Sequence, residues 1–146
     1  MREKLDSKRY LFLSIHQQYA ELILEGKKTV ELRRRKPNVE AGDIVILYAT
    51  SPMCSVLGTA EIKGITEDTP SAIWESCGKK AKLPKENFDV YFEASSTAVA
   101  ISLNNHQRLD KPIPLSCLRK LLSNFSPPQS YRYITQMDAL QLGIKK

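Results

Sequence analysis

Two runs of residues that are apolar at nearly every position constrain the fold more than any other feature of the chain. The runs are YLFLSIH (residues 10–16) and DIVILYATS (residues 43–51). Short runs rich in β-branched and aromatic residues favour strands, and a strand that is apolar on both sides needs cover on both faces. We therefore expect two buried strands, with the second at the centre of a barrel or a sandwich.

Alternating and mixed patterns add further strands to these two. The sequence predicts them over residues 29–35, 55–67, 97–104 and 106–115. Prolines place the last of these strands toward an edge, because a proline cannot donate to a neighbouring strand. Gly58 and Gly64 are expected at bulges or at points of close backbone approach.

Short helices are predicted between and after the strands. They cover residues 17–26, 69–83, 84–94, 115–125 and 135–143. Thr69, followed by Pro70 at the first helical position, and Thr135 are typical N-cap residues. Gly26 and Gly143 mark helix ends.

About six strands, mostly consecutive, with short helices inserted or appended, predict an α+β fold built on a small mixed β-barrel. The chain has 146 residues and shows neither an internal repeat nor a long linker. That length suits one core. We therefore expect a single domain over residues 1–146.

Charge points to the class of partner. The formal net charge is +6 and the pI is about 9.3. Such an excess favours RNA or another nucleic acid, a nucleotide-like ligand or an anionic surface. Because the cations are grouped rather than dispersed, they can sum to a local field.

The cysteines and the N-terminus indicate the cellular compartment. Cys54, Cys77 and Cys117 are odd in number and not closely spaced, which favours free thiols in a reducing compartment. With only two histidines they are a poor set for structural zinc, so we expect neither a metal nor a cofactor. No apolar run approaches a membrane span, and the N-terminus is charged. We expect a cytoplasmic protein with no membrane partner.

Charged and apolar residues alternate in EGKKTVELRRRK, residues 25–36. In a strand, Val30 and Leu32 would point to one side and the polar side chains to the other. Lys28, Glu31 and Arg33 could then form a cluster in which the carboxylate orients two cations and leaves N–H donors for a phosphate or a base. The alternative is an amphipathic strand whose outer face is solvated and weakly salt-bridged.

Other polar residues are candidates for the same site. Ser14, His16, Tyr48 and Ser51 lie near the ends of the two apolar runs. His16 could act as a donor or a general base, or it could cap the helix that follows. Arg35 would add to affinity by contacting a phosphate of the backbone.

A second stretch, SYRY, places Arg132 between Tyr131 and Tyr133. Aromatic rings interleaved with a guanidinium can stack on unpaired bases. Equally, one tyrosine could pack in the core. Cys54 could be a nucleophile if His16 lay close to it, and is otherwise a structural thiol.

The segment from Gly26 to Arg33, GKKTVELR, resembles the G-x-K-x-x-E-x-R signature of ASCH domains at Gly26, Lys28, Glu31 and Arg33. Flanking segments LSIHQQYAELILEGKKTVELRRRKP, AGDIVILYATSP and FSPPQSYRYI are similar to stand-alone ASCH proteins of bacteria, archaea and phages. The resemblance implies a PUA-like barrel with a cleft beside the helix that ends at Gly26. It also implies binding of RNA or another nucleic acid.

Some members of this family are enzymes. One branch resembles an amidohydrolase that uses a lysine, a threonine three residues later and a distant glutamate. Here the lysine falls at Lys28, but Glu31 occupies the threonine position, and a carboxylate cannot replace an activated hydroxyl in the same geometry. We therefore do not extend that activity to this chain. Other ASCH proteins have been proposed as ribonucleases.

The leading interpretation is a nucleic-acid-binding module, of a kind that could regulate transcription or translation. The first alternative is an enzyme on RNA or modified nucleosides. In it, Lys28 and Glu31 act as acid and base and His16 or Tyr48 assists. The second is a transcriptional co-regulator that acts through protein contacts.

Overall fold

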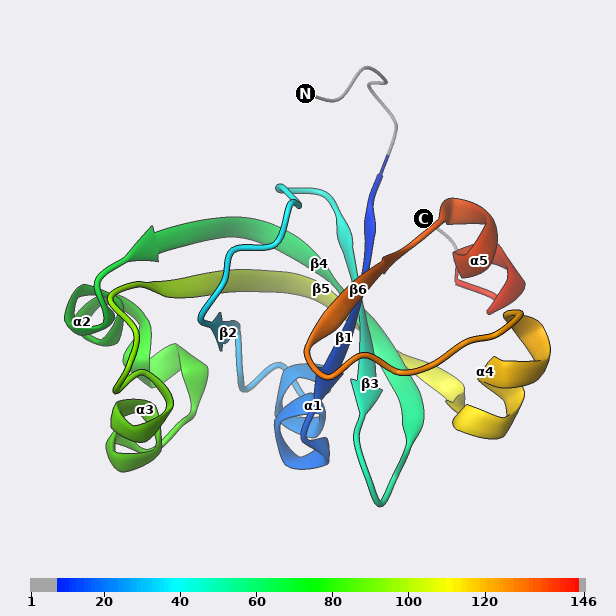
Figure 1. The fold of residues 1–146 in the computed structure, drawn as a ribbon, viewed down its shortest axis with the longest axis horizontal. Coiled ribbons are helices and arrows are strands. Elements are labelled where there is room, and N and C mark those ends of the chain that lie inside the picture. The colour runs from blue at the N-terminus through cyan, green and yellow to red at the C-terminus, as the bar shows by residue number, and fades with distance from the viewer. Residues whose placement is uncertain (1–7, 145–146) are drawn as a thin grey trace.

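A single mixed sheet of six strands organises residues 8–144, the part of the chain that the computed structural model describes (Figure 1). The strands are β1 (Tyr10–Ile15), β2 (Val30–Arg33), β3 (Ile44–Ala49), β4 (Ser55–Asp68), β5 (Ala98–Pro114) and β6 (Tyr131–Ile134). Their order across the sheet is β2-β5-β4-β3-β1-β6. Within this sheet β1 and β3 are parallel and the other neighbours are antiparallel. The predicted α+β class and mixed sheet are confirmed.

Five helices surround the sheet in the described part of the chain. They are α1 (Gln17–Leu24), α2 (Pro70–Ala81), α3 (Lys85–Tyr91), α4 (Leu115–Leu121) and α5 (Gln136–Gln141). Helices α2 and α3 lie at one end of the molecule and α4 and α5 at the other (Figure 1). The expected N-caps are present, because Thr69 accepts a hydrogen bond from the Ala72 N–H and Thr135 from the Asp138 N–H. None of these helices is long and apolar enough to cross a membrane.

Strands β1 and β3 are buried on both faces, as their sequences predict. One core contains Leu11, Leu13, Val45 and Leu47 on one side of the sheet. A second core, on the other side, contains the alternate residues of the same strands, among them Phe12. A third cluster packs β2 against α2 and α3. Continuous apolar runs are therefore required wherever a strand separates two cores.

Two strand predictions differ from the structure. The strands predicted over 97–104 and 106–115 form one long strand, β5, which passes through Asn105 at a φ of 48°. Beyond Ser102, β5 pairs with β4 alone, so its two prolines lie where no second neighbour needs an N–H donor. Strand β6 is absent from the predicted set, because SYRY is short and polar.

The sheet curls without closing. Its edge strands β2 and β6 are not paired with each other in the described residues. Arg33 of β2 nevertheless reaches the carbonyl oxygen of Ser14 in β1 and the hydroxyl of Ser130 just before β6. We call this gap between β2 and the β1–β6 edge the seam. A side chain bridges it where a closed barrel would have backbone hydrogen bonds.

Two glycines of β4 differ in the space available for a side chain. A Cβ on Gly58 would collide with the backbone oxygen of Gln107 and lie 2.7 Å from Cδ2 of Leu24, whereas one on Gly64 would meet nothing within 4 Å. We expect Gly58→Ala to lower the free energy of unfolding by about 1–3 kcal/mol. Gly64→Ala should change it by less than about 1 kcal/mol. Urea unfolding measures both, and equal losses would contradict this account of the packing at Gly58.

Candidate functional site

A cavity of about 450 Å³ opens along the seam. Strands β1 and β2, the start of α1, helix α3 and the residues before β6 form its walls. We call it the seam cavity. Its lining residues are Ser14, Ile15, His16, Tyr19, Lys28, Glu31, Leu32, Arg33, Arg34, Thr50, Leu83, Asn87, Tyr91, Gln129 and Ser130. A mixture of polar groups with apolar and aromatic walls, in this range of volume, is typical of small-ligand sites.

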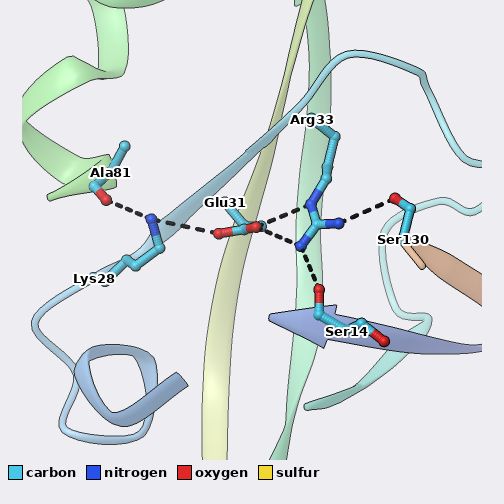
Figure 2. A network of polar contacts seen from close by, with 6 residues as sticks. All are labelled: Ser14, Lys28, Glu31, Arg33, Ala81 and Ser130. Carbon is cyan, nitrogen blue, oxygen red and sulfur yellow. Dashed lines mark hydrogen bonds and ion pairs between the residues drawn. The ribbon is translucent and has the colours of Figure 1, made fainter. Parts of the chain in front are cut away.

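Glu31 connects two cations within this cavity (Figure 2). One of its carboxylate oxygens accepts hydrogen bonds from Nε and Nη2 of Arg33, at 2.9 and 2.7 Å. The other lies 3.4 Å from the Lys28 ammonium. The three residues therefore form one ion network, which we call the Lys–Glu–Arg network.

The network is anchored at both ends. Lys28 donates to the carbonyl oxygen of Ala81, the last residue of α2, where a cation also suits the helix dipole. Arg33 donates to the carbonyl oxygen of Ser14 at 2.9 Å and to the Ser130 hydroxyl at 3.1 Å. Figure 2 shows these contacts on opposite sides of Glu31. The network thus joins α2 to β1 across the seam.

Burial distinguishes this network from a solvated strand face. Lys28, Glu31 and Arg33 are only 4%, 8% and 9% exposed, so the solvated alternative is wrong. Burial lowers the pKa of Lys28 and nearby Arg33 lowers it further, while Glu31 opposes both effects. Val30 and Leu32 pack in the third core, with Leu32 also at the border of the seam cavity, which confirms the predicted alternation.

Both cations keep a donor for a ligand. An ammonium has three N–H groups and a guanidinium has five. In residues 8–144, Lys28 uses two of them, on Ala81 and Glu31. Arg33 uses four, on Glu31, Ser14 and Ser130. Each therefore retains one N–H group with no oxygen of the described residues as its partner, on a side chain that lines the cavity, and the network carries one net positive charge.

His16 lies where β1 gives way to α1. Its backbone oxygen accepts hydrogen bonds from the N–H groups of Tyr19 and Ala20, but its side chain does not cap the helix. The exposed imidazole instead lines the seam cavity. Tyr19, one turn later, lies with its ring centroid 5.1 Å from the Lys28 ammonium, a cation–π distance.

The structure places several predicted site residues outside the seam cavity. Tyr48 packs in the second core against Phe12, at 5.4 Å between ring centroids, because its side chain projects to the far face of β3. Burial and a hydrogen bond with Cys54 raise the pKa of Tyr48 to about 12. Ser51 is exposed in the turn after β3. Cys54 packs against the second core and does not line the cavity of His16.

Strand alternation separates the members of SYRY. Tyr131 and Tyr133 contact each other at 5.9 Å between ring centroids. Tyr133 accepts a hydrogen bond from the Asn38 N–H. Arg132 projects to the other face, where it donates to the Ser126 carbonyl and lies over Phe125. The predicted platform of interleaved rings and guanidinium is therefore not formed.

Ser14 and Arg35 border the site in different ways. Ser14 lines the seam cavity, but its hydroxyl donates to the Pro128 carbonyl at 2.7 Å. Its backbone oxygen, not its side chain, meets Arg33. Arg35 lines an adjoining cavity.

Sequence reasoning misses part of the lining. The missed polar and aromatic residues are Tyr19, Thr50, Asn87, Tyr91, Gln129 and Ser130. Apolar periodicity places Tyr19 and Tyr91 on helix faces that pack in the core, since it cannot separate a core face from a cavity wall. Ser130 would follow only from recognising β6 as the strand beside β1. Within residues 8–144 no three His, Cys, Asp or Glu side chains are grouped as a metal site requires.

Comparisons with known proteins agree with this fold. The ASCH domain model matches residues 13–107. A Zymomonas mobilis protein named ASCH domain-containing ribonuclease is 35% identical over 130 residues, which are 89% of this chain and 87% of that protein. The crystal structure of ASCH from Zymomonas mobilis superposes with a TM-score of 0.87 at 34% identity, covering 92% and 93% of the two chains. The predicted PUA-like fold is confirmed, with a six-stranded sheet that forms a half-barrel in place of a closed one.

A more distant structure, the N-terminal domain of Staphylothermus marinus McrB, shares the fold alone. Its TM-score is 0.60 at 11% identity, over 98% of this chain and 97% of that one.

The Lys–Glu–Arg network predicts unequal effects of removing its charges. Glu31→Gln would leave Lys28 and Arg33 buried without a counter-charge, and we expect it to lower the free energy of unfolding by about 3–5 kcal/mol. Lys28→Met keeps the Glu31–Arg33 pair neutral and removes an ammonium that burial disfavours. Its cost, mainly the lost bond to Ala81, should be about 1–2 kcal/mol.

Chemical denaturation of the two variants checks this order. Glu25→Gln is the control, because Glu25 belongs to an exposed ion pair with Lys27. It should change the free energy of unfolding by less than about 0.5 kcal/mol. If Glu31→Gln were no more harmful than this control, the network would not hold the seam.

Proposed function

The chain belongs to the ASCH domain family, and on that premise we propose that it binds single-stranded RNA in the seam cavity and cleaves it. The relative named a ribonuclease aligns with most of this chain and supports the proposal. One observation on the molecule itself carries it. Two buried cations, fixed by a shared carboxylate, each keep an N–H donor beside a concave cavity.

Those donors suit a phosphate or the edge of a base. Charge-assisted hydrogen bonds to phosphate are about twice as strong as neutral ones. They gain further where burial lowers the local dielectric. Because Lys28 and Arg33 are already held by protein groups at both ends of the network, their remaining donors cost little to orient. Tyr19 and Tyr91 add aromatic rings on which an unpaired base can stack.

When the neighbouring 2′-hydroxyl cleaves an RNA phosphodiester, a P–O bond forms to the 2′-oxygen and the bond to the 5′-oxygen breaks, so the first oxygen must lose a proton and the second must gain one. We assign this proton transfer to His16, whose exposed imidazole lines the same cavity. An imidazole is the side chain best suited to proton transfer near neutral pH. Lys28 and Arg33 would bind the phosphate on which charge develops.

Glu31 takes a positioning role in this proposal. Its carboxylate accepts two hydrogen bonds from Arg33 and lies beside Lys28, so it is engaged as a counter-ion. A carboxylate held in this way is a poor nucleophile or base. The same engagement argues against amidohydrolase chemistry at this position.

Binding without cleavage is the second candidate function. It is favoured because Glu31 is the one carboxylate among the described residues that line the seam cavity, and it is already engaged. A protein of this kind would act as a regulatory RNA-binding module. The two candidates share the cavity and differ only in turnover.

Adjacent lysines provide the test. We expect the wild-type protein to cleave an end-labelled single-stranded RNA and Lys28→Met to lose about 10–100-fold of that rate, since one charge-assisted hydrogen bond is worth about 1.5–3 kcal/mol. Lys27→Met is the matched control, because Lys27 is exposed and outside the cavity. Rates from gel electrophoresis, with melting curves for each variant, measure the effect.

The outcomes separate the candidates. Binding by the wild-type protein with no cleavage would reject the ribonuclease and leave the binding module. Equal cleavage by all three preparations would show that the activity lies outside the seam cavity or comes from a contaminant. A failure of all three to bind RNA would reject both candidate functions.

A further inference from the structure

A second cavity, of about 750 Å³, adjoins the first and is lined by three consecutive arginines. We call it the arginine groove; it contains Arg33, Arg34, Arg35, Tyr91, Ser130 and Tyr131 among its walls. Arg33, Arg34, Tyr91 and Ser130 line the seam cavity as well. A ligand in one cavity can therefore continue directly into the other.

The groove is built almost entirely from hydrogen-bond donors. Among the described residues, no carboxylate lines it. Arg33 is balanced by Glu31, whereas Arg34 and Arg35 form no ion pair within residues 8–144. The groove thus carries about two uncompensated positive charges, which favour an anion with several acceptor oxygens.

Two tyrosines, Tyr91 and Tyr131, line the arginine groove together with its two outer arginines. The Arg34 guanidinium lies 4.3 Å from the ring centroid of Tyr91, the last residue of α3. Burial raises the pKa of Tyr131, and nearby Tyr133 adds to this, while Arg35 and Arg33 lower it. Arg35 and Tyr131 line the same groove.

We propose that the arginine groove is a phosphate subsite, which binds the backbone phosphate next to the nucleotide held in the seam cavity. This inference rests on the proposed binding of RNA. The two cavities would bind different parts of the nucleotide chain. The seam cavity, with its tyrosines, Asn87 and apolar walls, would bind the base and the sugar. The arginine groove would bind the negatively charged phosphate. Two adjoining subsites require at least a dinucleotide, and a base inside the seam cavity must be unpaired.

The salt dependence of binding tests the subsite. The probe is a ten-nucleotide single-stranded RNA with 2′-O-methyl groups, measured by fluorescence anisotropy between low and physiological salt. We expect the double variant Arg34→Gln, Arg35→Gln to bind about tenfold or more weakly at physiological salt. A plot of the logarithm of the association constant against the logarithm of the salt concentration has a negative slope. In the double variant this slope should become less negative by about 0.7 for each phosphate of the single strand that the protein no longer neutralises.

Two controls make the result specific. Arg119→Gln removes an exposed arginine from α4, at the other end of the molecule, and should change neither affinity nor slope. The same oligonucleotide with neutral methylphosphonate linkages should bind the wild-type protein and the double variant equally. Melting curves confirm that the variants are folded.

Each outcome decides between the proposals. If the double variant keeps the wild-type slope while Lys28→Met weakens binding, the phosphate subsite is overturned and the proposed function stands. If duplex RNA binds as tightly as the single strand, the division into base and phosphate subsites is overturned. If the wild-type protein binds neither form, the proposed function fails and this inference fails with it.

Discussion

Arg33 reaches across the one gap in the described sheet that backbone hydrogen bonds do not close, and it does so because Glu31 holds it. The two residues are separated by one position in β2, so their side chains lie on the same face. Glu31 binds two of the guanidinium N–H groups, which leaves others for Ser14 and Ser130 on the far side of the seam. Without the carboxylate, two buried cations would repel each other where the edges of the sheet must meet. Closure of the seam and the shape of its cavity therefore depend on the same ion pair.

The sequence predicts the local parts of this arrangement well. Helix caps at Thr69 and Thr135 and the alternation of Val30 with Glu31 depend on residues a few positions apart, so local patterns are enough to identify them. The expected place of Tyr48 at the site is wrong for a physical reason. Because β3 is buried on both faces, its apolar pattern carries no information about which face is which. Local patterns do not identify Tyr91 and Ser130 as site residues, since they reach the cavity from segments distant in the chain.

The triple arginine illustrates how the end of a strand changes the role of its neighbours. Within β2, successive side chains alternate between the seam and the third core. The strand ends at Arg33, and beyond it the alternation no longer applies, so Arg34 and Arg35 can both border the arginine groove. One run of like charges therefore supplies a buried structural cation followed by two exposed ones. Composition alone would count all three as a solvated basic patch.

A site located at a seam couples binding to closure of the fold. The donors that Lys28 and Arg33 would offer to RNA belong to side chains that already join α2, β2 and β1. A ligand that contacts both cations would span the same gap and stabilise the closed arrangement through linkage. Closure of the seam favours binding in turn. When Arg33 already closes the seam, its donors are in place and binding has no further ordering cost. The interaction that limits how far the sheet can open is thus the one that prepares the cavity for an anionic ligand.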